Sequence, residues 1–215
     1  MRLHLPPAPG VAADVASAAD KLYLMTASSE PVPVAGVHFF TIDDVLKYSP
    51  FCADFGPFNL GMLDHALQEL KERLDNPRHS KIVYWTSSRA ADITNSVFLL
   101  GAFLVAVLGA TPEQAWAPFG KLNVEQVKAY RDATWIPSTY DLPVQECWAG
   151  LSRALAKGLY QPSAFDRAEY FYYDLNGDAH DVVPGKFVAF KGPTDEAKPY
   201  CTWRPEQVCS ARACV

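Results

Sequence analysis

Apolar residues are concentrated in one stretch near the middle of the chain, residues 81–110. Residues 82–85 form a β-branched and aromatic run that favours a strand. Small and polar residues follow at 86–92, and residues 97–110 are apolar throughout. We therefore predict strand, loop and buried helix in succession. In an α/β domain such a unit directs backbone N–H groups of the loop and the helix start at one point, which makes it a natural anion site.

The rest of the pattern predicts strands and helices on both sides of this unit. Aromatic and β-branched residues predict strands at 21–25, 37–41 and 186–190, and residues 43–59 are typical of a loop. Helical spacing and capping residues predict helices from Asn59 to about residue 75, from Thr111 to about 117, from 143 to about 158, and from 163 to 174. Residues 121–140 have no decisive pattern. The chain is therefore predicted to have an α/β fold.

Composition narrows the possible partners. The 215 residues are 49% hydrophobic, and the formal net charge of −5 argues against a nucleic-acid partner. The longest apolar run is too short to span a membrane and lacks basic flanks, so no membrane partner is expected. Five scattered cysteines, without a signal peptide before them, favour reduced thiols in the cytoplasm, the nucleus or both.

No metal or other cofactor is predicted. Cys201, Cys209 and Cys214 are irregularly spaced and have no histidine nearby, and the histidines are scattered along the chain. The four consecutive residues 170–173 are all aromatic. We interpret this aromatic cluster as a face that docks against the rest of the fold.

One segment matches the C-x5-R pattern of cysteine phosphatases, with Cys147 as the nucleophile and Arg153 as the phosphate clamp. The pattern requires an open loop between the two residues, whereas Cys147 already lies within helical apolar spacing. Six residues along a helix place the two side chains roughly 120° apart, so they cannot converge on one phosphate. The preceding Glu146 would also disfavour a thiolate. We interpret this match as incidental.

The loop after the central strand has the position of a phosphate loop without its chemistry. Residues 86–92 contain no cysteine, and the hydroxyls of Ser87 and Ser88 have no base in view. Arg89 comes early in the loop, and Asp92 near the helix start would repel phosphate. We predict a degenerate phosphate loop consisting of Thr86, Ser87, Ser88, Arg89 and Asp92.

Several segments occur in an order that suggests a family. They are K-L-Y-L at 21–24, A-D-F-G-P-F-N-L at 53–60, K-I-V-Y-W-T at 81–86 and V-P-G-K-F-V-A-F at 183–190. Over about residues 21–193 the chain resembles the N-terminal half of the cell-division-cycle-fourteen family of dual-specificity phosphatases. The resemblance implies a cysteine-phosphatase-type sheet flanked by helices, in a domain that lacks the nucleophile and helps to shape a substrate groove.

The resemblance also implies how the chain is divided. We expect a flexible tail at 1–20, the N-terminal phosphatase domain at 21–180, and a linker strand with a remnant at 181–215. The family's second domain carries an H-C-x-x-G-x-x-R loop, and that pattern does not occur in this chain. A catalytic domain in cis or in trans is therefore an expected partner.

Acidic residues are the expected substrate contacts. The family prefers a basic residue downstream of phosphoserine or phosphothreonine followed by proline, and Asp132, Glu169 and Asp174 lie in or beside the matching segments. The family's linker helix usually has another acidic residue at the position of Phe171. An alternative interpretation of each of the three acids is that it is an ordinary solvated residue of the surface.

Three functional hypotheses follow. The first is the substrate-recognition domain of a phosphatase in cell-cycle control, inactive by itself and located in the cytoplasm, the nucleus or, by the resemblance, at the spindle or centrosome. The second is a stand-alone pseudophosphatase that binds or scaffolds phosphoproteins. The third, catalysis through Cys147, conflicts with the helical geometry.

Overall fold

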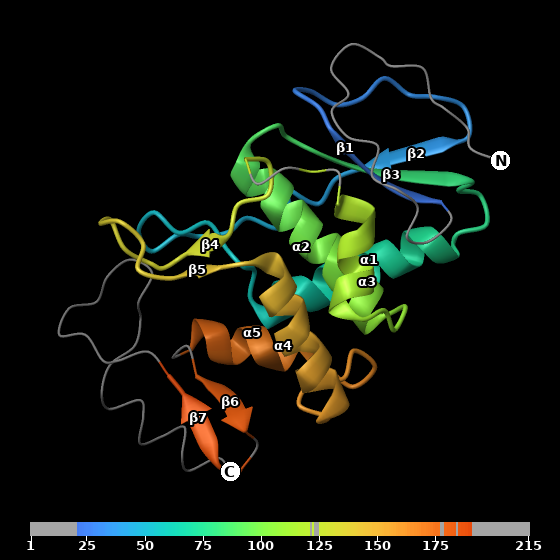
Figure 1. Cartoon of the computed structure of the whole chain (residues 1–215). Coiled ribbons are helices and arrows are strands. Elements are labelled where there is room, and N and C mark those ends of the chain that lie inside the picture. The colour runs from blue at the N-terminus through green and yellow to red at the C-terminus, as the bar shows by residue number, and fades with distance from the viewer. Residues whose placement is uncertain (1–20, 121, 123–124, 177–178, 184, 191–215) are drawn as a thin grey trace. The chain divides into compact units, whose positions relative to one another are not determined.

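The computed structural model describes residues 21–120, 122, 125–176, 179–183 and 185–190 (Figure 1). Its contacts divide the chain into two compact units, Met1–Ala156 and Lys157–Val215. The boundary that we predict at residue 180 remains a prediction. The expected tail at 1–20 lies outside the described residues, as does the remnant from 191 onward.

Unit 1 contains a parallel sheet of three strands. The strands are β1 (Leu22–Thr26), β2 (Val37–Phe40) and β3 (Lys81–Thr86), in the order β1-β3-β2. Leu24 lies opposite Tyr84 on one side of β3, and Phe40 lies opposite the same residue on the other. The central strand buries consecutive residues because both of its faces are covered, whereas β1 buries alternate residues. The three predicted strands of this region are confirmed.

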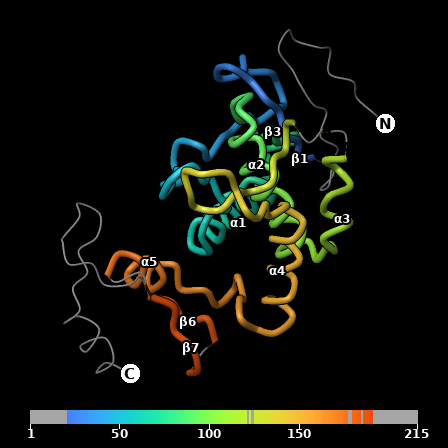
Figure 2. The backbone as a smooth tube through the Cα atoms, turned by 60° about the vertical axis from the view of Figure 1, so that its left-hand side comes forward, coloured from blue at the N-terminus to red at the C-terminus, as the bar shows by residue number. Residues whose placement is uncertain are grey.

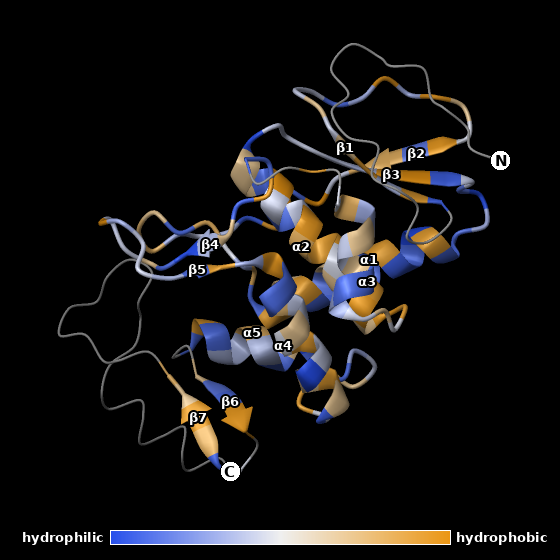
Figure 3. Cartoon of the chain, in the orientation of Figure 1, coloured by the Kyte–Doolittle hydropathy of each residue, from blue (hydrophilic) through white to orange (hydrophobic). Residues whose placement is uncertain are grey.

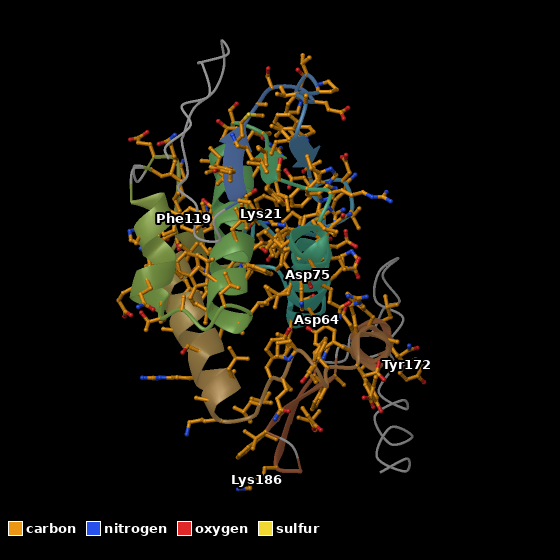
Figure 4. The ribbon with its side chains drawn as sticks, turned by 90° about the vertical axis from the view of Figure 1, so that its right-hand side faces the viewer. Lys21, Asp64, Asp75, Phe119, Tyr172 and Lys186 are labelled. Carbon is orange, nitrogen blue, oxygen red and sulfur yellow. The ribbon has the colours of Figure 1, made fainter. Side chains whose placement is uncertain are left out.

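Helix α1 (Leu60–Asp75) connects β2 to β3, as a parallel crossover requires. The Asn59 side chain accepts a hydrogen bond from the Met62 N–H group at 2.9 Å, so the predicted cap and helix are confirmed. Asp64 of this helix, which is labelled in Figure 4, is fully buried and accepts a hydrogen bond from the Gln68 amide at 3.0 Å.

Helix α2 (Ala90–Ala106) begins earlier than predicted. Thr86 belongs to β3, and Asp92 lies in the first turn of α2, so the connecting loop contains only residues 87–89 (Figure 2). The prediction of a loop through Asp92 was therefore wrong. Ala90 and Ala91 favour a helix, and polar residues at a helix start can face a cavity without ending the helix. The helix also ends before residue 110, since Gly109 adopts a φ of 71°.

Two further helices pack on α2. Helix α3 (Pro112–Trp116) continues into the short helix η1 (Ala117–Phe119). It begins with the predicted capping box, in which the Gln114 N–H group donates to Thr111 Oγ1 at 3.2 Å and the Thr111 N–H group donates to Gln114 Oε1 at 2.8 Å. Helix α4 (Val144–Ala156) confirms the predicted amphipathic helix. Strands β4 (Tyr130–Arg131) and β5 (Asp141–Leu142) form a hairpin partly within the region left unassigned.

Gly101 of α2 lies against the side chain of Trp148 of α4. The Trp148 side chain is fully buried, and its Nε1 group donates to the Phe98 carbonyl at 3.0 Å. A Cβ atom on Gly101 would lie 1.9 Å from Trp148 Cζ2. The indole also lies near the rings of Trp116 and Phe119, at centroid distances of 6.3 and 6.1 Å. Glycine at 101 is therefore a packing requirement.

Unit 2 contains helix α5 (Arg167–Leu175) and the antiparallel hairpin of β6 (His180–Val183) and β7 (Phe187–Ala189). The helix begins later than residue 163 because Asp166 caps it, accepting from the Glu169 N–H group at 2.9 Å. The predicted strand at 186–190 is confirmed as β7, and β6 was not predicted. No residue of α5 is buried, and Tyr172, labelled in Figure 4, is 62% exposed. The interpretation of the aromatic cluster as a docked face stays a prediction.

Replacing Gly101 by alanine should destabilise unit 1 by about 1–3 kcal/mol, because the added methyl group overlaps a fixed indole ring. Gly150→Ala is the matched control, since Gly150 lies in α4 and a Cβ atom there would meet nothing within 4 Å. That substitution should be neutral or stabilising by up to about 1 kcal/mol. Urea unfolding followed by circular dichroism measures both changes. Equal stability of the two variants would contradict the packing requirement.

Candidate functional site

A cavity of about 610 Å³ lies beside the C-terminal end of β3. Its walls come from the segment 41–58, the end of β3 and the first turns of α2. This is the edge of a parallel sheet at which ligands commonly bind in α/β domains. Acidic, basic and aromatic side chains line it, among them Asp43, Tyr48, Asp54, Trp85, Arg89 and Asp92.

Asp43 connects the segment after β2 to the end of β3. Its Oδ1 atom accepts from the Tyr84 hydroxyl and its Oδ2 atom from the Thr86 hydroxyl, both at 2.6 Å. Burial raises the pKa of Asp43 above its ordinary value, and the hydrogen bonds from Thr86 and Tyr84 oppose that rise. Thr86 is fully buried, so its hydroxyl serves this contact rather than a ligand.

The sequence alone did not point to Asp43. The available signal was its position just after a strand of a parallel sheet, where side chains from neighbouring strands meet.

Within the predicted degenerate loop, the Asp92 carboxylate accepts hydrogen bonds from the groups that would otherwise hold an anion. Arg89 donates to both carboxylate oxygens of Asp92, from Nε to Oδ2 and from Nη2 to Oδ1, each at 2.8 Å. The Ser87 hydroxyl donates to Asp92 Oδ2 at 2.5 Å and accepts from the Arg89 N–H group at 3.1 Å. The bond to Asp92 raises the pKa of Arg89. Ser88 is exposed. The guanidinium and one hydroxyl are thus satisfied from within the chain.

Asp54 fixes the opposite wall of the cavity. It is 5% exposed and accepts from the Tyr48 hydroxyl at 2.5 Å and from the N–H groups of Cys52 and Phe51 at 2.7 and 3.3 Å. Burial alone would raise the pKa of Asp54, but these hydrogen bonds bring it below its ordinary value. This carboxylate therefore holds the segment 48–54 in its conformation.

Asn95 of α2 joins that wall to the hairpin. Its amide donates to the Phe55 carbonyl at 2.9 Å and accepts from the Tyr130 hydroxyl at 3.0 Å. A Cβ atom on Gly56 would lie 2.4 Å from the Tyr130 ring, so the A-D-F-G-P segment needs glycine there. The cavity wall is thus fixed at both ends.

Cys147 is not placed as a phosphatase nucleophile. It lies with Arg153 on α4, as predicted, so the two side chains cannot form a phosphate loop. Burial raises the pKa of Cys147 to about 11. The thiol is therefore protonated at neutral pH and is a weak nucleophile.

Asp132, the first predicted substrate-contacting acid, stabilises the loop between β4 and β5. Its Oδ2 atom accepts from the N–H and hydroxyl groups of Thr139 at 3.2 and 2.9 Å. The N–H group of Thr139 is the main cause that lowers the pKa of Asp132. The structure therefore gives this carboxylate a contact within its own loop.

Glu169 and Asp174, the other two predicted acids, both lie on α5 in unit 2. Glu169 is exposed, and Asp174 Oδ1 lies 3.5 Å from His180 Nε2. Five residues along a helix separate two side chains by about 140°, so they point in different directions from α5. The structure does not bring these two acids together, and the role of all three acids in substrate binding remains a prediction.

Among the described residues, no group of three or more histidine, cysteine, aspartate or glutamate side chains could hold a metal ion. Within the same residues, no helix has both the length and the apolar character needed to cross a membrane.

Comparison with known proteins assigns the family. Residues 16–154 match the family described as dual specificity protein phosphatase, N-terminal half. The dual specificity protein phosphatases CDC14A of Mus musculus and Homo sapiens are 37% and 36% identical over 183 residues, which cover 83% of this chain. The tyrosine-protein phosphatase CDC14 homolog of Schizosaccharomyces pombe is 32% identical over 197 residues, 88% of this chain.

The matched part is a limited portion of each relative. It amounts to 30% and 31% of the mouse and human proteins and to 36% of the yeast protein, so the chain spans about a third of their length. The family match ends at residue 154, close to the end of unit 1 at Ala156. On this evidence the chain belongs to the family formed by the N-terminal half of the CDC14-type dual specificity protein phosphatases.

Proposed function

We propose that this chain is the non-catalytic, substrate-recognising half of a dual-specificity protein phosphatase. The observation that carries the proposal is the bond between Asp92 and Arg89, because it fills a phosphate-loop position with a carboxylate of the chain itself. Catalysis belongs to a phosphatase domain joined in cis or supplied in trans. The substrates are phosphoproteins of cell-cycle control, and the chain acts with its partner in the cytoplasm, the nucleus or both.

The degenerate loop explains why this half would not hold a phosphate itself. A strand, a short loop and a helix start would ordinarily present N–H groups and an arginine to a phosphate. Here the arginine and Ser87 are bound to Asp92, and the neighbouring Thr86 is bound to Asp43. A phosphate would have to displace one carboxylate and approach a second one, which costs free energy.

Substrate selection rests on the acidic character of this half. Asp132, Glu169 and Asp174 attract a basic residue that follows a phosphoserine-proline or phosphothreonine-proline site. Because Glu169 and Asp174 diverge on α5, they act as separate contributors to the local potential rather than as two ligands of one lysine. The expected preference is therefore modest and sensitive to salt.

The purified chain should not hydrolyse p-nitrophenyl phosphate. The thiol of Cys147 is held protonated by its raised pKa and has no arginine within its own turn of helix. Hydrolysis is measured as the release of p-nitrophenolate, which is monitored by absorbance with the chain in excess over the substrate. Robust turnover that disappears in Cys147→Ser would contradict the proposal.

Asp92→Ala should create an anion site by releasing Arg89 and Ser87. We expect saturable phosphate binding by this variant at about millimolar concentration, and none by the natural chain in that range, as measured by ³¹P NMR. Arg89→Ala combined with Asp92→Ala should abolish the binding again.

Asp44→Ala is the matched control for Asp92→Ala, because Asp44 lines the same cavity and its loss changes the net charge equally. Phosphate binding by Asp44→Ala as tight as by Asp92→Ala would show that net charge, and not the released arginine, is responsible.

A phosphoserine-proline peptide with a downstream lysine should bind about two- to fivefold more tightly than the same peptide with alanine there, the range expected for exposed charge pairs. Fluorescence anisotropy at low and high salt measures the difference. Glu169→Gln and Asp174→Asn should each reduce it, whereas Glu113→Gln, an exposed acid at the start of α3, should not. Equal binding of both peptides would exclude the proposed preference for a downstream basic residue.

A further inference from the structure

The sequence contains two dipeptides of a type that proline-directed protein kinases modify, a serine or threonine followed by proline. They are Ser49-Pro50 and Thr111-Pro112. Phosphoryl transfer requires a substrate hydroxyl that can reach the catalytic base and the nucleotide of the kinase. The local structure around each dipeptide therefore decides whether it can be modified.

Ser49 has an accessible hydroxyl. Ser49 and Pro50 are both exposed, and residues 46–50 have no regular secondary structure. The Ser49 hydroxyl makes no hydrogen bond within the part of the chain that the structure describes. A residue before proline is also restricted to extended conformations. This serine thus has a free acceptor oxygen on an extended, exposed segment.

Thr111 has a different setting. Its hydroxyl accepts a hydrogen bond from the Gln114 N–H group at 3.2 Å and caps α3, whose first residue is Pro112. A kinase would have to unwind the start of α3 to bind this segment as an extended chain. The structure therefore favours modification at Ser49 over Thr111.

Asp54 holds the chain on both sides of the Ser49-Pro50 dipeptide. It accepts from the Tyr48 hydroxyl at 2.5 Å, and from the N–H groups of Phe51 and Cys52 at 3.3 and 2.7 Å. None of these bonds involves the dipeptide itself. A phosphate at position 49 would consequently leave them intact.

The modified position borders the cavity beside β3. Tyr48 and Pro50, on either side of Ser49, both line this cavity. A phosphoserine adds about −1.5 to −2 charge at neutral pH. Phosphorylation would therefore place a strong negative charge at the cavity wall.

The cavity is already acidic. The start of α2, which lines it, includes hydrophilic residues (Figure 3). The bond to Asp92 compensates the charge of Arg89, and burial raises the pKa of Asp43, with the negative charge of Asp92 adding to that rise. Four aspartates contribute to the lining: Asp43, Asp44, Asp54 and Asp92. A phosphate at position 49 would extend this negative potential.

We propose that Ser49 is a phosphorylation site for a proline-directed protein kinase, and that its phosphate strengthens the selection of substrates with a downstream basic residue. The second part rests on the proposed function. In the transfer, Ser49 Oγ forms a bond to the γ-phosphorus of ATP, the bond from that phosphorus to the bridging oxygen breaks, and ADP leaves. The hydroxyl proton passes to the catalytic base of the kinase.

Mass spectrometry of the whole chain tests the site. The purified 215-residue chain is incubated with a cyclin-dependent protein kinase and Mg-ATP. The natural chain and Thr111→Ala should gain the mass of one phosphoryl group, and Ser49→Ala should gain none. Pro50→Ala keeps the hydroxyl and should also remain unmodified. An unmodified natural chain, or equal modification of Ser49→Ala, overturns the proposal. Circular dichroism verifies that each variant is folded.

Peptide binding tests the effect of the phosphate. Fluorescence anisotropy compares the phosphoserine-proline peptides with a downstream lysine or alanine, before and after kinase treatment. Both peptides carry the same phosphate, so its repulsion by phosphorylated Ser49 cancels in the ratio of their affinities. That ratio should rise about twofold at low salt, and the rise should disappear at high salt. Kinase-treated Ser49→Ala should keep its original ratio.

An unchanged ratio for the phosphorylated natural chain overturns the proposed effect. Failure of the proposed function has a different signature, because neither form of the chain would then discriminate between the two peptides. The mass measurement decides the modification site in either case.

Discussion

Burial of α2 is the constraint on which the arrangement of unit 1 depends. A helix that is apolar on nearly every side must be covered all round, and α2 packs against β3, α1, α3 and α4. Two of its buried polar side chains, those of Thr94 and Ser96, have hydrogen-bond partners within the chain. The Lys128 N–H group donates to Thr94 Oγ1 at 2.9 Å, and Ser96 Oγ donates to the Asp92 carbonyl at 2.8 Å. The close passage of Gly101 beside Trp148 then fixes the position of α4.

That packing determines what the candidate site can do. Three residues separate β3 from the start of α2, and Ala91 and Asp92 of its first turn line the cavity, so the positive end of the helix dipole lies beside the cavity. An acid is favourable at such a position, and Asp92 supplies it from within the first turn. The same geometry that could hold a phosphate is thus satisfied by a side chain.

The sequence predicted most where local chemistry decides the structure. The capping residues Asn59 and Thr111 and the β-branched run of β3 gave elements close to those observed. It failed where tertiary contacts decide. The polar residues at 86–92 suggested a loop, although Asp92 lies on a helix whose first turn lines a cavity. Asp43 gains its role only because the sheet brings β2 beside β3, and the very short strands β4 and β5 depend on long-range packing.

Unit 1 is packed on several sides of α2, whereas the β6–β7 hairpin exposes Val182, Phe187 and Val188. Amide hydrogen exchange of the isolated chain compares the two directly. Amides of α2 should exchange only through global unfolding, and those of the hairpin should exchange orders of magnitude faster. Hairpin amides protected as strongly as those of α2 would contradict this difference between the two units.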